Sequence, residues 1–495
     1  MREEVERKQV FRLSKYRKAK SVGTSKEEEE KIVMKRITFV TISLLAVLAT
    51  LLVSCATPTV APAPTSGAPK VVEPTKAPAA MPYGLKPGKP YAGTKIVWLF
   101  SPATQWEAIK ERVGQFTDLT GITVEFAPIP YANLLDKITT EAVGGTGAYD
   151  AIWFTDSWGP SLANYFVPLN DRIKADGLDL NRYPKAYQES GAFKGQQLAL
   201  PLRGHPQLLF YRKDILEKAG VKPPTTWKEL EEASKAIKDK TGLYGIAPFY
   251  TKGSGLQNLW VWLTYLWSNG GDIFDEKWRP TFNNAAGVEA TQRFTDLVKK
   301  GYAPPGSVTF TEYDGSNSVM QGESAMVMTW WWHISNLTNA KTAKAEVVSN
   351  IAFAPMPGWE GKGGASYTTV GVIGMFKSSK KQDATWEFLK WVTNPDLEKA
   401  WALDKSKPET TTNVVVHKAN LVDPEINKAW DGMQAAASKS LEVARILPRL
   451  AEWPQVGSVL EIAINEIASG KPTKETLDKA AAEVTAIMER AGYYK

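Results

Sequence analysis

The chain has 495 residues, of which 43% are hydrophobic, and that is more than one ordinary domain needs for its core. Its net charge is +7, but residues 1–54 contain twelve Lys and Arg against seven Glu, so only +2 remains for the rest. A folded part this close to neutral excludes a protein that relies on a broad basic surface, and we expect no nucleic-acid partner.

Residues 34–54 have the features of a secretory signal. A cationic start, Met34-Lys35-Arg36, precedes an uncharged run at 37–53. The segment Leu52-Val53-Ser54-Cys55 resembles the lipobox of bacterial lipoproteins, whose cysteine is acylated and becomes the new N-terminus. Cys55 is the only cysteine, which excludes an intramolecular disulfide and a cysteine-based metal site. The alternative is an uncleaved signal anchor, since such a run is just long enough to span a bilayer.

Two further segments flank this signal. Residues 56–90 contain nine of the 31 prolines, so we interpret 55–91 as an extended, Pro-rich tether between the lipidated cysteine and the folded part. Residues 1–33 are rich in charge and precede a complete signal, which indicates a misassigned start codon with Met34 as the true start. A cytoplasmic regulatory tail is the alternative.

The folded part begins with alternating strands and helices. Apolar strand patterns at 95–100, 122–126 and 149–154 enclose two segments with helical spacing. This order predicts a parallel α/β sheet, and ligand crevices in such sheets lie at the carboxyl ends of strands. The segment 154–159 stands at one such end. Further on, Thr226 and Glu229 form a capping box, and the chain after Gln382 is mainly helical.

Several blocks, in order along the chain, resemble one known family. They are GQQLALP at 195–201, LFYRKD at 209–214, AGVKPPTTW at 219–227, MQGESAM at 320–326, VGV at 370–372 and ATWEFL at 384–389. Together they are similar to the family-1 extracellular solute-binding proteins of bacterial ABC importers, in particular the sugar-binding lipoproteins of the maltose-binding-protein type. Arg212 stands where the family pattern has Asn.

The resemblance implies a type II periplasmic-binding-protein fold, with two α/β lobes joined by a multi-stranded hinge that close over a ligand. The chain would cross between lobes near 202–208, 326–329 and 371–376. Lobe 1 would comprise 92–205 and 327–373, and lobe 2 would comprise 206–326 and 374–495. The implied role is capture of a mono- or oligosaccharide outside the cytoplasm and its delivery to the transmembrane permease by a monomeric, lipid-anchored protein.

A carbohydrate site needs flat aromatic rings for C–H faces and planar polar groups for hydroxyl pairs. The chain has 18 tryptophans, most of which belong in the core. Three adjacent ones, Trp330 to Trp332, cannot all be buried on one face, which favours exposure of one to a cleft. The resemblance assigns that place to Trp332. It also puts Trp260 on a sugar-stacking position and Asn258 on a polar contact.

Other candidates follow from position. Asp156 lies at a strand end where similar proteins place a sugar-binding Asp, although this loop is one residue shorter; the alternative is a helix N-cap. His205 lies in the first predicted crossing, and Arg203 shares its strand face. Trp453 precedes the C-terminal helices in a region that faces the cleft in the relatives.

Catalysis is not indicated. The three histidines lie far apart in the chain, and no nucleotide-binding or serine-hydrolase motif is present, so we expect no enzyme activity, cofactor or metal. A lipid-anchored glycosidase stays open, because paired carboxylates meet only in the fold. A polyol, a phosphorylated polyol or an amino-acid derivative also stays open as the ligand.

Overall fold

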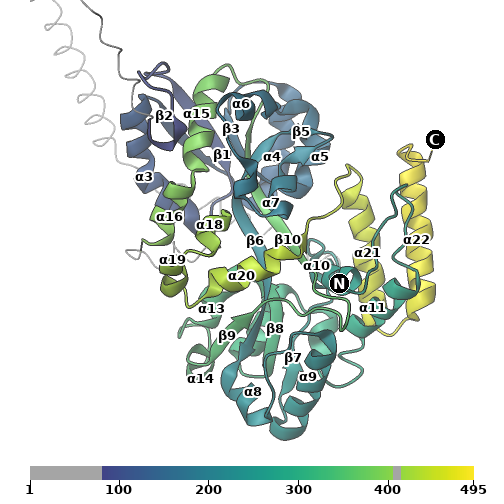
Figure 1. Ribbon diagram of the computed structural model, residues 1–495. Helices are drawn as coiled ribbons and strands as arrows, with labels where there is room; N and C mark the ends of the chain where they lie inside the picture. The colour runs from purple at the N-terminus through teal and green to yellow at the C-terminus, as the bar shows by residue number, and fades with distance from the viewer. Residues whose placement is uncertain (1–80, 405–413, 495) are drawn as a thin grey trace, which may run out of the picture. The chain divides into compact units, whose positions relative to one another are not determined.

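The computed structural model describes residues 81–404 and 414–494 (Figure 1). The predictions for the N-terminal extension, the signal, Cys55 and most of the tether therefore lie outside the described residues. Among the described residues, no helix is long and apolar enough to cross a membrane.

The strands are β1 (Lys95–Phe100), β2 (Thr123–Pro128), β3 (Ala151–Thr155), β4 (Ala192–Phe193), β5 (Gln196–Gln197), β6 (Ala199–Arg212), β7 (Tyr244–Ile246), β8 (Ser324–Trp330), β9 (Ile351–Ala354), β10 (Ser366–Met375) and β11 (Ala444–Arg445). The longer helices are α3 (Thr104–Thr120), α4 (Tyr131–Gly144), α9 (Trp227–Thr241), α10 (Gln257–Ser268), α11 (Ala285–Thr295), α12 (Glu312–Met320), α15 (Gln382–Val392), α16 (Pro395–Ala402), α20 (Met433–Glu442), α21 (Trp453–Ala468) and α22 (Thr473–Arg490). Shorter ones are α5 (Gly159–Leu162), α6 (Asn170–Ala175), α7 (Lys185–Ser190), α8 (Lys213–Ala219), α13 (Ile334–Leu337), α14 (Ala345–Val348), α18 (Lys418–Leu421) and α19 (Pro424–Ala429).

The predicted strand–helix–strand opening is confirmed. Strand β1 pairs in parallel with β2 and β3, and α3 and α4 connect them. Helix α3 ends at Gly121, whose φ of 71° suits a residue without a side chain. The capping box of α9 is also present, with the Thr226 hydroxyl and the Glu229 carboxylate each accepting a backbone N–H.

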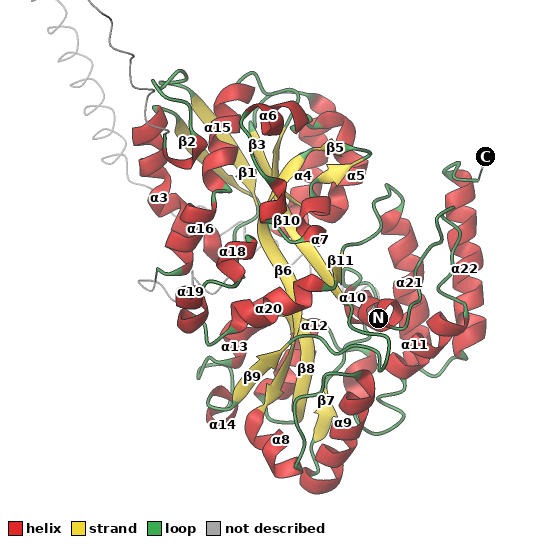
Figure 2. Cartoon of the chain, viewed as in Figure 1, coloured by secondary structure: helices red, strands yellow, loops and turns green. Residues whose placement is uncertain are grey.

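Seven strands follow one another in the order β2-β1-β3-β10-β6-β8-β7. Strand β6 is long enough to pair with different strands along its length (Figure 2). Its first part, to Pro206, pairs with β10, and its second part, from Gln207, pairs with β8 and β9. We call the region of β1, β2, β3 and the first part of β6 the first half, and the region of β7, β8, β9 and the rest of β6 the second half.

Buried side chains form two hydrophobic cores. Residues 208–210 of β6 contribute alternately to the two cores, because successive residues face opposite sides of a strand. Leu208 and Phe210 belong to the first core, and Leu209 belongs to the second. The first core also contains the β1–β3 side chains, and the second contains those of α9, α10, α21 and α22.

The late helices divide between the two cores. Phe388 of α15 contacts Trp98 of β1 and Phe116 of α3, with ring centroids 5.5 and 5.6 Å apart. The buried residues of 384–441 therefore belong to the first core, whereas the prediction assigned 374–495 as a whole to lobe 2. Strands β8 and β9 pair with the second part of β6, while Val327, Leu337 and Val347 of the same stretch belong to the first core.

Candidate functional site

Polar side chains gather on one face of the central strands, where β3 ends. In the β6–β10 pairing, His205 lies opposite Thr369 and Arg203 lies opposite Gly371. Gly371 in turn lies opposite Thr155 of β3. Paired residues share a face of the sheet, so Thr155, Thr369, His205 and Arg203 form one polar row. The Oγ1 atoms of Thr155 and Thr369 are 3.3 Å apart.

Asp156 is the first residue after β3, and it is buried. Its Oδ1 accepts hydrogen bonds from the Thr369 hydroxyl at 2.6 Å and from the Val370 N–H at 3.1 Å. Arg449 Nη1 lies 3.9 Å from its Oδ2. Burial raises the pKa of the Asp156 carboxyl, and the Arg449 guanidinium and these hydrogen bonds only partly oppose that rise. Asp156 is the first residue of a short 3-10 turn, Asp156–Trp158, whose N-cap position is occupied by Thr155.

Aromatic rings pack beside this row, and we call Trp260, Trp330, Trp331 and Trp332 the aromatic wall. Trp330 and Trp331 are 1% exposed, whereas Trp332 is only partly buried and packs against both cores. The Trp332 ring stacks on Trp330 at 5.4 Å and meets the His205 ring edge-on at 5.0 Å. Trp260, also partly buried, lies 4.9 Å from Trp330. The structure thus brings four predicted residues, Asp156, Arg203, His205 and Trp332, to one region, with Trp260 at its edge.

His205 and Arg203 are the members of the polar row that contact the aromatic wall. His205 stacks on Trp331 at 6.3 Å, and the Arg203 guanidinium lies 5.9 Å from the same ring. Burial, and then the charge of Arg203, hold the pKa of His205 well below its ordinary value, so the ring is neutral near pH 7.

Two residues that were predicted to contact the ligand, Asn258 and Trp453, are buried. Asn258 is fully buried, and its Nδ2 donates to the main-chain oxygens of Glu461 at 2.8 Å and Tyr250 at 3.4 Å. It joins α10 to α21, so its position does not support the expected ligand contact. Trp453 is 3% exposed and belongs to the second core, although its indole N–H has no hydrogen-bond partner among the described residues.

Sequence reasoning missed several neighbours of the site. Thr369 and Tyr367 come from β10, and the Tyr367 ring lies 5.5 Å from Trp330. Arg449 comes from the loop before α21. Tyr131 is 54% exposed and stacks on Trp158 at 5.3 Å. Only Trp158 carried a signal in the sequence, since it follows Asp156 by two residues.

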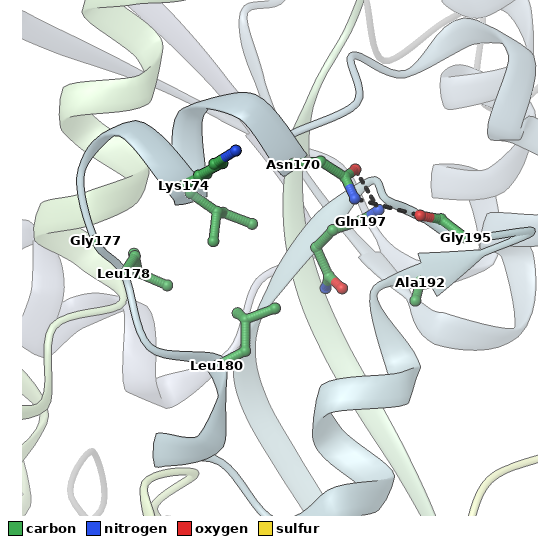
Figure 3. Close-up of a pocket in the computed structure, with 9 residues that line it drawn as sticks. Asn170, Lys174, Gly177, Leu178, Leu180, Ala192, Gly195 and Gln197 are labelled. Carbon is green, nitrogen blue, oxygen red and sulfur yellow. Dashed lines mark hydrogen bonds between the residues drawn. The ribbon is translucent and has the colours of Figure 1, made fainter.

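A separate cavity of about 350 Å³ lies in the first half. Figure 3 shows Asn170 at one side, where its amide joins Gly195 and Gln197. Ile173, Leu178 and Leu180 supply apolar lining, and no predicted site residue takes part. Within the described ranges, no group of His, Cys, Asp and Glu is arranged to hold a metal ion.

This architecture agrees with one family of binding proteins. The chain belongs to the bacterial extracellular solute-binding proteins, and the family model matches residues 101–399. It is therefore an extracytoplasmic solute-binding protein.

Individual relatives cover most of the folded part. A probable amino-acid ABC transporter periplasmic-binding protein of Sinorhizobium fredii is 28% identical over 425 residues, which are 82% of this chain and 92% of that protein. A mannitol-binding protein of Pseudomonas aeruginosa is 26% identical over 273 residues, which are 53% of this chain and 60% of that protein. The maltose-bound MalE3 protein of T. maritima matches the structure with a TM-score of 0.68 and 24% identity, over 80% of this chain and 100% of that one. The predicted two-lobed α/β fold is thereby confirmed.

Proposed function

We propose that the protein captures a carbohydrate or polyol outside the cytoplasm and delivers it to the permease of an ABC importer. One observation carries this proposal: Trp332 packs against both cores and faces a row of polar side chains on β6 and β10. An aromatic face beside hydrogen-bonding groups suits a ring or chain that carries hydroxyl groups along its edges and C–H bonds on its faces.

Capture would proceed by closure of the two halves. Asp156 and Thr369 belong to the first half, while Trp260 and Trp330 belong to the second. A ligand that contacts both sets binds the closed form more tightly than the open form, and so shifts the population towards closure. In this role Trp332 stacks on the ligand, His205 and Arg203 meet its polar edge, and Asp156 accepts from a hydroxyl.

The relatives support this ligand class. One sequence relative is a mannitol-binding protein, and one structural neighbour holds maltose. The S. fredii relative is described as a probable amino-acid transporter component, which makes an amino acid the second candidate ligand. The aromatic wall favours a carbohydrate or polyol over an amino acid.

The remaining parts of the proposal concern partners. The mature protein would begin at Cys55, carry acyl chains there and reach over the membrane surface on the Pro-rich tether 55–91. It would act as a monomer, without a cofactor and without catalysis, and its macromolecular partner would be the permease.

A thermal-shift screen of the full chain tests the ligand class. The panel holds neutral monosaccharides, disaccharides, polyols, phosphorylated polyols and amino acids. A ligand at a hundred times its Kd stabilises the protein by about 2.7 kcal/mol, which raises the melting temperature measurably. We expect a carbohydrate or polyol to give the largest rise, and incubation with it to yield no cleavage product. A rise with amino acids alone would overturn the proposal.

A further inference from the structure

Among the buried polar atoms without a hydrogen-bond partner in the described part of the chain, four lie near Arg203 and His205 of β6. They are Gln105 Oε1, Trp153 Nε1, Arg203 Nε and His205 Nδ1. Buried polar groups are almost always paired, so a cluster of unpaired ones indicates a missing partner. A ligand in the cleft would supply it.

The four atoms belong to residues that lie next to or opposite Arg203 in the strands. Gln105, in the first turn of α3, uses its Nε2 to donate to the Leu202 oxygen at 3.3 Å, next to Arg203. A Cβ at Gly371 would lie 2.3 Å from Trp153 Nε1, and Gly371 is the register partner of Arg203. Glycine at 371 therefore lets the Trp153 N–H reach the strand position opposite Arg203. His205 shares the face of Arg203 two residues along β6.

The charge of this cluster is unbalanced. Arg203 forms no ion pair with any described carboxylate, and the nearby Asp156 is engaged by Thr369, Val370 and Arg449. Burial lowers the pKa of the Arg203 guanidinium to about 10, so the group stays protonated at neutral pH. His205 is neutral there, as shown above. One positive charge without a counter-charge therefore lies at this cluster on a partly buried side chain, and withdrawing such a charge from water without a counter-charge is costly.

We infer that the ligand is a carbohydrate bearing one carboxylate, such as a sugar acid, and that Arg203 binds that carboxylate. The inference rests on the proposed function and narrows its ligand class. A planar guanidinium matches a carboxylate in a two-bond pairing, and one cation neutralises one monoanion. A phosphate, with a charge of about −1.5 to −2 near pH 7, would call for a second cation. The Trp153 N–H and the Gln105 oxygen remain for a hydroxyl acceptor and a hydroxyl donor.

Titration calorimetry on the full chain tests this with pairs that differ only in the carboxylate. The probes are D-glucuronate against D-glucose, D-galacturonate against D-galactose, D-gluconate against D-glucitol, and maltobionate against maltitol as a disaccharide pair. Glucose 6-phosphate provides the phosphate arm. We expect an acid to bind about ten- to a hundredfold more tightly than its neutral counterpart, as hydrogen bonds between charged groups imply.

Arg203→Gln should abolish this preference, because it should lower the affinity for the acid far more than the affinity for its neutral counterpart, and Arg203→Lys should retain part of the preference. Removing an unpaired buried charge should leave the melting temperature equal or higher, whereas a structural arginine would lower it. Arg445→Gln, which alters an exposed arginine paired with Asp272, serves as the matched control and should keep the preference.

Three results overturn the inference while leaving the proposed function in place. They are a neutral sugar that binds as tightly as its acid, an Arg203→Gln variant that keeps the preference, and tighter binding of glucose 6-phosphate than of any sugar acid. Absence of binding to every carbohydrate and polyol, with a ligand found among the amino acids, would instead overturn the proposed function, and this inference with it.

Discussion

Arg449 donates a hydrogen bond of 2.6 Å from its Nη1 to the main-chain oxygen of Asp156. Its Nε and Nη2 donate to the oxygen of Ala192 at 3.1 and 2.8 Å. Asp156 and Ala192 belong to the first half, while Leu447 and Leu450, on either side of Arg449, belong to the second core. One guanidinium therefore ties the loop before α21, whose leucines pack in the second core, to the edge of the site in the first half.

Arg449→Ala should favour the open form. The lost bonds involve a charged donor, worth about 1.5–3 kcal/mol, so ligand binding should weaken by about ten- to a hundredfold. Small-angle scattering of the ligand-free variant should show a larger radius of gyration than that of the wild type. Arg445→Ala, four residues earlier in the chain, is the control and should change neither quantity. Unchanged affinity and radius in Arg449→Ala would show that the bridge has no role in closure.

Trp332→Ala should weaken ligand binding by about 2–4 kcal/mol, the scale of interface hot spots, because it removes a stacking face from the cleft. Its effect on thermal stability should be modest, since the ring is only partly buried. Trp391→Ala provides the contrast: Trp391 is fully buried beside Phe116 and Phe388, and its truncation should cost about 3–5 kcal/mol of folding free energy. Calorimetry beside thermal melting separates the two. A sharp loss of stability with intact affinity in Trp332→Ala would make Trp332 a core residue.

Asp156→Asn should change stability in a pH-dependent way. Because burial raises the pKa of the Asp156 carboxyl, the folded protein retains a proton that the unfolded chain releases, and the free energy of unfolding falls as pH rises from the ordinary range of an Asp through the raised pKa. Asn does not titrate, so the melting temperature of the variant minus that of the wild type should increase as the pH rises from about 4, the ordinary range of an Asp, through the raised pKa. Above the raised pKa, ligand binding should weaken by about 1–2 kcal/mol, since the variant lacks the carboxylate that accepts from the ligand there.

The control for this prediction is Trp391→Ala, whose ring packs against Phe116 and Phe388, so its difference in melting temperature from the wild type should not depend on pH. If the difference for Asp156→Asn stays constant or decreases over the same range, the raised pKa of Asp156 is refuted.

Asn258→Ala should reduce stability and spare binding. The change leaves the Glu461 oxygen without its donor inside the core, which costs about 1–3 kcal/mol. The Tyr250 oxygen keeps a second donor, Asn465 Nδ2 at 2.8 Å, so Asn465→Ala is the matched variant and should also lower the melting temperature. Weaker ligand binding at unchanged stability would restore the role that the sequence predicted for Asn258.

Mass spectrometry of the native protein should show an acylated Cys55 at the N-terminus and nothing before it. Two acyl chains hold a protein at a membrane stably, at about 0.8 kcal/mol per buried methylene, whereas one does so only marginally. Cys55→Ser should leave the protein unacylated with its signal uncleaved. Recovery of intact residues 34–54 in the membrane-bound wild type would favour the signal anchor instead.

Local patterns in the sequence were sufficient for much of the fold. The strand and helix periodicities at 95–154 predicted the parallel opening of the sheet, and the Thr226–Glu229 spacing predicted the start of α9. The Trp330–Trp332 triplet predicted that one ring would differ in burial from the other two, and Trp332 does. These features depend on residues close in the chain, whose alternation and hydrogen bonding are set by backbone geometry.

Only the tertiary structure decided how distant segments combine at the site. The sequence did not predict that Thr369 would lie opposite His205 and donate to Asp156, since these residues are separated by more than 150 positions and meet through cross-strand register. The same holds for Arg449, which reaches Asp156 from a loop that no local pattern distinguishes. Asn258 lies on a well-predicted helix, but its burial depends on α21 packing against it. Such contacts arise from the packing of two cores against one another, and the order of residues alone does not encode them in any short pattern.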